Sequence, residues 1–100
     1  MEYRRLGESG LKISVLSLGS WVTFANQVDD DLALKMMQYA YEKGVNFFDN
    51  AEVYEAGASE EMMGRVLRKC AWARDTYIVS SKVFWGGGLP TQRGLSKKHI

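Results

Sequence analysis

Apolar and polar residues follow two periods along this chain, and the change of period predicts strands and helices in turn. Short apolar runs indicate strands, whereas apolar positions three and four residues apart indicate helices. The strand-like runs are residues 15–20, 45–48 and 77–83. The helical faces between them carry Ala33, Met36, Met37 and Ala40, and then Met62, Met63, Val66 and Leu67. Strand, helix and strand therefore follow one another twice, which is typical of a parallel α/β sheet.

Local signals indicate where each predicted helix begins or ends. Asp29 or Asp30 is the expected N-cap of the first helix, and Gly44 is expected to end it. Ser59 is the expected N-cap of the second helix, because two glutamates follow it in the favourable first turn. Ser96 is expected to start a third helix that the chain does not finish.

The N-terminal residues predict a two-stranded hairpin, with residues 3–6 paired to residues 11–13 across a glycine-containing turn. Residues 15–20 then alternate between two leucines and the small residues Ser17 and Gly19. Neighbouring residues of a strand point to opposite faces, so one face of this strand presents little side chain. That face is equally consistent with a closely packed helix and with a ligand that approaches the backbone.

Composition and charge are those of an ordinary soluble globular protein and exclude several functions. The 100 residues are 46% hydrophobic and 25% charged, and a net charge of +1 lacks the basic excess of nucleic-acid-binding proteins. Cys70 is the only cysteine and His99 the only histidine, so we expect no internal disulfide and no metal site on these ligands. His99 is expected on a helix surface. A single cysteine and the absence of a membrane-spanning run of roughly 20 apolar residues fit a cytoplasmic location.

An acid, a phenol and an amine follow the ends of two successive predicted strands. Asp49 comes directly after residues 45–48, Tyr54 comes five residues later, and Lys82 lies near the end of residues 77–83. A free phenol is a weak acid, but a nearby ammonium stabilises its phenolate, and a carboxylate keeps that ammonium charged. Such a set can protonate a carbonyl oxygen while hydride arrives at the carbon. The spacing alone also fits a structural ion pair beside an ordinary loop tyrosine.

Several stretches of this chain resemble the aldo-keto reductase family. The matching runs are Tyr3-Arg4-x-Leu6-Gly7-x-Ser9-Gly10-Leu11, Phe47-Phe48-Asp49-x-Ala51-x-x-Tyr54, Gly57-x-Ser59-Glu60 and Ile78-Val79-Ser80-Ser81-Lys82. Within the family, the surroundings of Trp21 and Trp85 are most similar to the β subunits of voltage-gated potassium channels and their bacterial relatives. Acid, tyrosine and lysine occur together in this order at the ends of consecutive strands, which makes the resemblance specific.

The resemblance implies an oxidoreductase on a (β/α)8 barrel, or TIM barrel. Such an enzyme reduces small aldehydes or ketones to alcohols with NADPH. The resemblance implies that Tyr54 is the proton donor and that Lys82 and Asp49 tune it. The cofactor supplies the hydride, and the protein supplies position and protons.

The same resemblance implies which residues surround the cofactor and the substrate. In the channel-subunit branch, the residues that match Ser20, Trp21 and Gln27 contact the cofactor, and Asp49 is expected near the nicotinamide ribose. Trp21 and Trp85 are expected to bound the carbonyl pocket. No metal ion is implied.

A complete barrel needs about 250 residues, so residues 1–100 are expected to be the N-terminal part of one barrel domain. They supply the hairpin and the first three β/α units, and we do not expect catalysis from this piece alone. The alternative function is a cofactor-sensing regulatory β subunit that docks on a voltage-gated potassium channel. The partners considered are a small carbonyl substrate, further copies of the chain and a channel subunit, without nucleic acid or direct membrane insertion.

Overall fold

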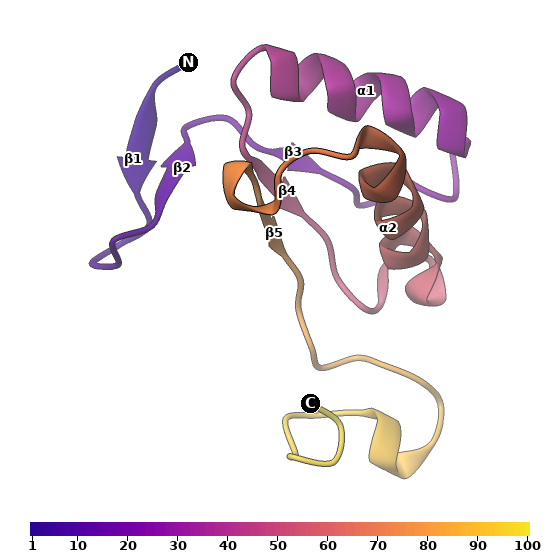
Figure 1. Ribbon diagram of the computed structural model, residues 1–100. Helices are drawn as coiled ribbons and strands as arrows, with labels where there is room; N and C mark the ends of the chain where they lie inside the picture. Colours follow the sequence, from indigo (N-terminus) through magenta and orange to yellow (C-terminus); the bar gives the residue numbers. More distant parts are fainter.

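The computed structural model describes residues 1–100 and has the predicted alternation of strands and helices. The elements of its main body are β3 (Leu18–Gly19), α1 (Asp30–Glu42), β4 (Phe47–Asp49), α2 (Ala58–Cys70) and β5 (Ile78–Ser80). The three strands form a parallel sheet in the order β3-β4-β5. Figure 1 shows α1 and α2 packed together beside this sheet. The parallel α/β class predicted from the sequence is therefore confirmed.

One apolar core holds the two helices against the sheet. Its buried members are Phe24, Ala33, Met37, Val45, Phe48, Met62, Met63 and Val66. They include Ala33 and Met37 from the predicted face of α1 and Met62, Met63 and Val66 from that of α2, because apolar residues three and four apart lie on one side of an α-helix. Ala40 and Leu67 pack against this core partly buried, whereas Met36, which was also predicted, does not belong to it. Neither helix has the length and apolar composition that crossing a lipid bilayer requires.

The N-terminal hairpin lies at the amino end of the sheet. Strand β1 (Tyr3–Arg5) pairs antiparallel with β2 (Lys12–Ser14), as predicted. The Tyr3 hydroxyl donates to the Gly44 carbonyl at 2.7 Å, and the Ser14 amide donates to Asn46 Oδ1 at 2.7 Å. Because these partners precede β4, the hairpin leaves the carboxyl end of the sheet free for a site.

The helix N-caps follow one prediction and overturn another. Asp29 caps α1, since its Oδ1 accepts the Leu32 amide at 2.8 Å. The prediction that Ser59 caps α2 is wrong: the N-cap is Gly57, with a φ of 97°, and Ser59 is buried inside the first turn. The chain enters α2 directly from the 3-10 turn η1 (Tyr54–Gly57), so the helix begins before the serine. Glycine suits this position because it adopts a positive φ without strain.

The strands are shorter than the apolar runs predicted. Residues 15–17 lie outside β3, and Lys82 lies beyond the end of β5. A strand extends only where a neighbouring strand pairs with it, and the central strand β4 has three residues. A Cβ added at Gly19 would meet no atom within 4 Å. No helix therefore packs closely on that residue, and the closely packed interpretation of the small strand face is wrong there.

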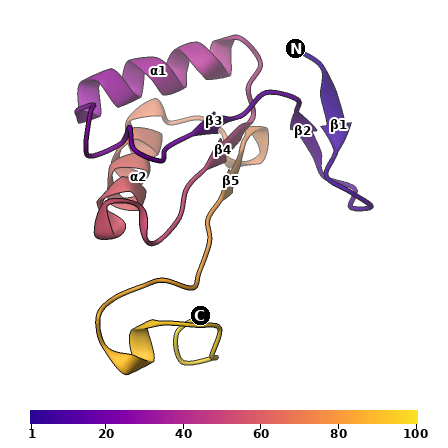
Figure 2. The ribbon, with the colours of Figure 1, turned by 180° about the vertical axis from the view of Figure 1, so that it is seen from behind.

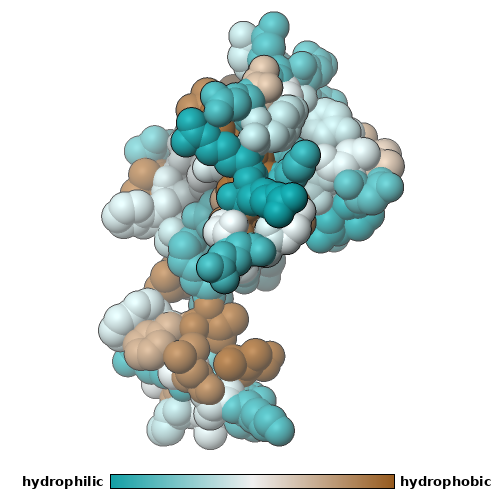
Figure 3. Space-filling view, turned by 90° about the vertical axis from the view of Figure 1, so that its left-hand side faces the viewer, coloured by the Kyte–Doolittle hydropathy of each residue, from teal (hydrophilic) through white to brown (hydrophobic).

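Residues 84–100 leave the sheet after β5 and fold apart from it (Figures 1 and 2). They contain a short 3-10 turn, η3 (Pro90–Gln92). The Ser96 carbonyl accepts the amides of His99 and Ile100, so a single hydrogen-bonded turn, and no helix, stands where the start of a third helix was predicted. Figure 3 shows exposed apolar side chains gathered on this segment; they include Phe84, Leu89, Leu95 and Ile100.

Candidate active site

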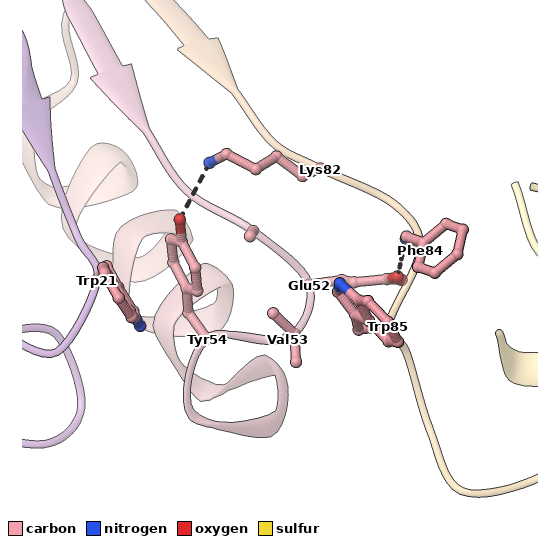
Figure 4. A pocket seen from close by; sticks show the side chains of 8 residues that line it. Trp21, Glu52, Val53, Tyr54, Lys82, Phe84 and Trp85 are labelled. Atoms are coloured by element: carbon pink, nitrogen blue, oxygen red, sulfur yellow. Dashed lines mark hydrogen bonds between the residues drawn. The ribbon is translucent and has the colours of Figure 1, made fainter. Parts of the chain in front are cut away.

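Asp49, Tyr54 and Lys82 meet at the carboxyl end of the sheet. Asp49 ends β4, Tyr54 begins η1, and Lys82 follows β5. Lys82 Nζ lies 2.7 Å from Asp49 Oδ2 and 3.2 Å from the Tyr54 hydroxyl oxygen. Figure 4 shows the tyrosine hydroxyl directed at the lysine. The residues meet because the carboxyl ends of neighbouring parallel strands lie at one edge of the sheet.

Lys82 is a charged donor fixed by three acceptors. Besides Asp49 and Tyr54, its Nζ donates to the Asn50 carbonyl at 2.7 Å. Partial burial lowers the pKa of Lys82, but the hydrogen bonds and charge interactions with Asp49 and Tyr54 outweigh burial, so this pKa lies above its ordinary value. Lys82 is therefore protonated at neutral pH and presents a positive charge to the phenol.

Asp49 is ionised, and its carboxylate is held by side chains of β5 and of the residues just after it. Burial raises the pKa of Asp49. Hydrogen bonds from Lys82 and Ser80, together with the lysine charge, lower it by more than burial raises it, so the pKa of Asp49 lies below its ordinary value. Ser80 Oγ donates to Asp49 Oδ1 at 2.5 Å. Sequence reasoning did not select Ser80, although it ends β5 opposite Asp49 in the register.

Besides Asp49, three residues were expected to contact the cofactor, and the structure gives each of them different surroundings. Trp21 is exposed and stacks on Tyr54, with ring centroids 6.1 Å apart and an interplanar angle of 23°. Ser20 is fully buried, and its hydroxyl donates to the Asp49 carbonyl at 2.8 Å, so it supports the end of β4. Gln27 is exposed in the loop before α1 and does not line the pocket beside Tyr54.

A pocket of about 380 Å³ opens beside the Tyr54 hydroxyl. Trp21 and Trp85, the two predicted walls, both line it, and Figure 4 shows them on opposite sides of Tyr54 and Val53. The complete lining is Trp21, Ala51, Glu52, Val53, Tyr54, Lys82, Phe84 and Trp85. A mostly apolar lining with a few polar groups suits a small organic molecule with one polar function.

Glu52 and His99 form a second polar pair that sequence reasoning missed. His99 Nε2 lies 3.1 Å from Glu52 Oε1, and the two side chains are only 10% and 20% exposed. The prediction that His99 lies on a helix surface is wrong, because the C-terminal turn directs its ring at Glu52. One signal was available in the sequence: an acid between Ala51 and Val53, just past a buried strand, needs a partner.

This fold and site define an α/β protein in which a carboxylate, an ammonium and a phenol stand beside an apolar pocket. The sequence profile of the Aldo/keto reductase family matches residues 15–100. The chain therefore belongs to the Aldo/keto reductase family.

Two known proteins illustrate the similarity. A probable voltage-gated potassium channel subunit beta from Arabidopsis thaliana is 53% identical over 100 residues, which cover all of this chain and 30% of the relative. The crystal structure of a thermostable aldo-keto reductase in complex with the inhibitor epalrestat superposes with a TM-score of 0.70 and 28% identity. That match covers 84% of this chain and 31% of the other. The chain thus spans about a third of the length of each of these proteins.

Proposed function

We propose that this chain carries the proton-transfer residues of an NADPH-dependent reductase of small aldehydes or ketones. The observation that carries the proposal is the position of Lys82 Nζ, which hydrogen-bonds both the Asp49 carboxylate and the Tyr54 hydroxyl. Membership of the Aldo/keto reductase family supports the oxidoreductase class. The roles of individual residues rest on the distances and charges at the site.

In the proposed reaction, Tyr54 donates its hydroxyl proton to the substrate oxygen as negative charge develops there. The Lys82 ammonium, 3.2 Å from the phenol oxygen, stabilises the phenolate that is left. Asp49 keeps Lys82 protonated and fixes its position. NADPH, when bound, supplies the hydride. The apolar pocket orients the carbonyl group toward Tyr54 and keeps water away from it.

The surroundings of Tyr54 fit the nicotinamide end of such a cofactor. Trp21 offers an exposed ring face, and Gly19, opposite Asp49 in the sheet, leaves the backbone open to an approaching group. Trp21 and Asp49 would hold that end of the cofactor. Ser20 fits an indirect role, because its hydroxyl is committed to the Asp49 carbonyl.

The test replaces Tyr54 in a barrel-length polypeptide, meaning one in which residues 1–100 are joined to the rest of a barrel of this family. We expect Tyr54→Phe to lower kcat for a reactive aldehyde by about 10²–10⁴-fold, because the proton donor is removed. NADPH binding, followed by fluorescence titration, should remain within about threefold of wild type, since the ring and its stacking on Trp21 are kept. Tyr39→Phe, at an exposed tyrosine of α1, is the matched control. Unchanged turnover in Tyr54→Phe ends the assignment.

The similarity to a probable potassium channel subunit beta favours a second candidate function. Under this hypothesis, the barrel-length polypeptide binds a voltage-gated potassium channel and senses whether the bound cofactor is oxidised or reduced. Co-expression with the channel's pore-forming subunit and affinity purification should recover both chains together. Recovery of the pore-forming subunit alone would reject this candidate and leave the reductase assignment intact.

A further inference from the structure

A single oxygen atom makes every hydrogen bond between residues 84–100 and the rest of the chain. Glu52 Oε1 accepts the Phe84 amide at 2.5 Å and the Gly86 amide at 3.0 Å, and it contacts His99 Nε2 at 3.1 Å. The other hydrogen bonds of this segment, such as that from the Gly94 amide to the Phe84 carbonyl, are internal to it. The position of the segment relative to Tyr54 therefore depends on the Glu52 carboxylate.

Glu52 continues the hydrogen-bond ladder between β4 and β5 after the two chains separate. The Asn50 amide donates to the Ser80 carbonyl at 2.9 Å, and the Glu52 amide donates to the Lys82 carbonyl at 3.2 Å. The backbone after Glu52 then turns away toward Tyr54. From that point its side chain, in place of a backbone carbonyl, accepts the amides of Phe84 and Gly86. The residue between those two amides is Trp85, which lines the pocket.

The contacts around Glu52 are close and favour its ionised form. The hydrogen bond with His99 lowers the pKa of Glu52, burial raises it, and the amides of Phe84 and Gly86 lower it further, so this pKa lies below its ordinary value. A Cβ at Gly86 would overlap the Gln92 carbonyl oxygen and lie 2.6 Å from His99 Cε1. The loop can therefore reach the carboxylate only because residue 86 is glycine.

We propose that Glu52 is a positioning residue, which holds Trp85 beside Tyr54 and thereby makes the pocket selective for carbonyl compounds with a flat apolar body. This inference rests on the proposed reductase function and adds a substrate class to it. With Trp85 held in place, a flat apolar ring can pack against the indole of Trp85, which lines the same mostly apolar pocket as Tyr54, while its carbonyl group points toward Tyr54. Without the carboxylate, the Phe84 amide, the Gly86 amide and the His99 ring lose their shared partner.

The kinetic test compares Glu52→Ala with Glu52→Gln in the barrel-length polypeptide, using benzaldehyde as the flat substrate and acetaldehyde as the small one. Glutamine keeps an acceptor oxygen in place, whereas alanine removes it. We expect Glu52→Ala to raise KM for benzaldehyde about tenfold with kcat changed less than about threefold, and Glu52→Gln to recover most of this loss. The KM for acetaldehyde should change less, because so small a substrate does not reach Trp85. Glu55→Ala, which removes an exposed acid of the same loop, is the matched control.

A double-mutant cycle tests whether Glu52 acts through Trp85. Trp85→Ala should itself raise KM for benzaldehyde, because one wall of the pocket is lost. Adding Glu52→Ala to Trp85→Ala should then change KM little, since the wall that Glu52 positions is already absent. Effects that multiply independently would overturn the proposed connection between the two residues.

A fluorescence measurement separates this inference from the reductase activity. Replacing Trp21 and Trp72 by phenylalanine leaves Trp85 as the only tryptophan of residues 1–100, and any tryptophan in the rest of the barrel is replaced as well. We expect Glu52→Ala to lower the anisotropy of Trp85 and to increase its quenching by acrylamide, whereas Glu52→Gln should stay near the starting values. Unchanged anisotropy in Glu52→Ala overturns the positioning role, whatever the activity. Failure of the wild-type polypeptide to reduce either aldehyde would instead count against the proposed function.

Discussion

The amino nitrogen of Lys82 lies 3.2 Å from the hydroxyl oxygen of Tyr54, although 28 residues separate the two in the sequence. Both residues lie beyond the ends of their strands, where the chain is free to turn side chains toward each other. The Asp49 carboxylate, 2.7 Å from the same nitrogen, completes a set in which each charge has a partner. This arrangement leads to specific expectations for substitution and for pH.

Replacing Lys82 by methionine should greatly reduce catalysis while keeping a side chain of similar length. We expect kcat for aldehyde reduction in the barrel-length polypeptide to fall by about 10²-fold or more, because the phenolate loses its neighbouring positive charge. Steady-state kinetics with saturating NADPH measure this change. Lys43→Met, at an exposed lysine after α1, serves as the control. A kcat within about twofold of wild type would contradict the role given to Lys82.

The stability that the Asp49–Lys82 pair contributes should depend on pH in a defined direction. The pKa of Asp49 is lowered by folding, so its contribution is present above the ordinary carboxyl pKa of about 4 and is lost as pH falls through the folded value. The pKa of Lys82 is raised, so its contribution is present below the ordinary amine pKa of about 10.4 and is lost as pH rises through the folded value. The pair therefore stabilises the fold most between these two limits.

Urea unfolding of wild type and Asp49→Asn measures this contribution. The lysine side chain is 52% exposed, so solvent screening limits the difference in free energy of unfolding at neutral pH to about 1 kcal/mol or less. We expect the difference to shrink at about pH 3 and at high salt. A difference that is the same at both pH values would show that the ion pair does not cause it.

Replacement by alanine should impair substrate binding at Gly86 and have no effect at Gly88, a second glycine of the same loop. At Gly86 an added methyl group would overlap the Gln92 carbonyl oxygen, whereas at Gly88 it would meet no atom within 4 Å. We expect Gly86→Ala to displace the loop that carries Trp85 and to raise KM for benzaldehyde by about tenfold, a change similar to that of Glu52→Ala. Gly88→Ala should match wild type in the same assay. Equal effects of the two substitutions would show that close packing at Gly86 does not position the loop.

Much of the fold was predictable because the signals are local. Most of the apolar faces of the two helices, the Asp29 cap and the alternation of strands and helices follow from periodicity and from short-range hydrogen bonding. The Ser59 prediction failed because the start of α2 depends on how η1 delivers the chain, and Gly57 takes the capping position instead. Strand lengths were overestimated because pairing, and not apolar character, determines where a strand ends.

The sequence by itself determined the alternation of strands and helices, and it placed Asp49, Tyr54 and Lys82 where neighbouring strands end. Those properties depend on residues close together in the chain. Only the tertiary structure decided that Ser20 supports Asp49 from a buried position, and that Glu52 joins Phe84, Gly86 and His99 to the body of the molecule. Hydrogen bonds between distant segments depend on how the whole chain packs, and no local period encodes them.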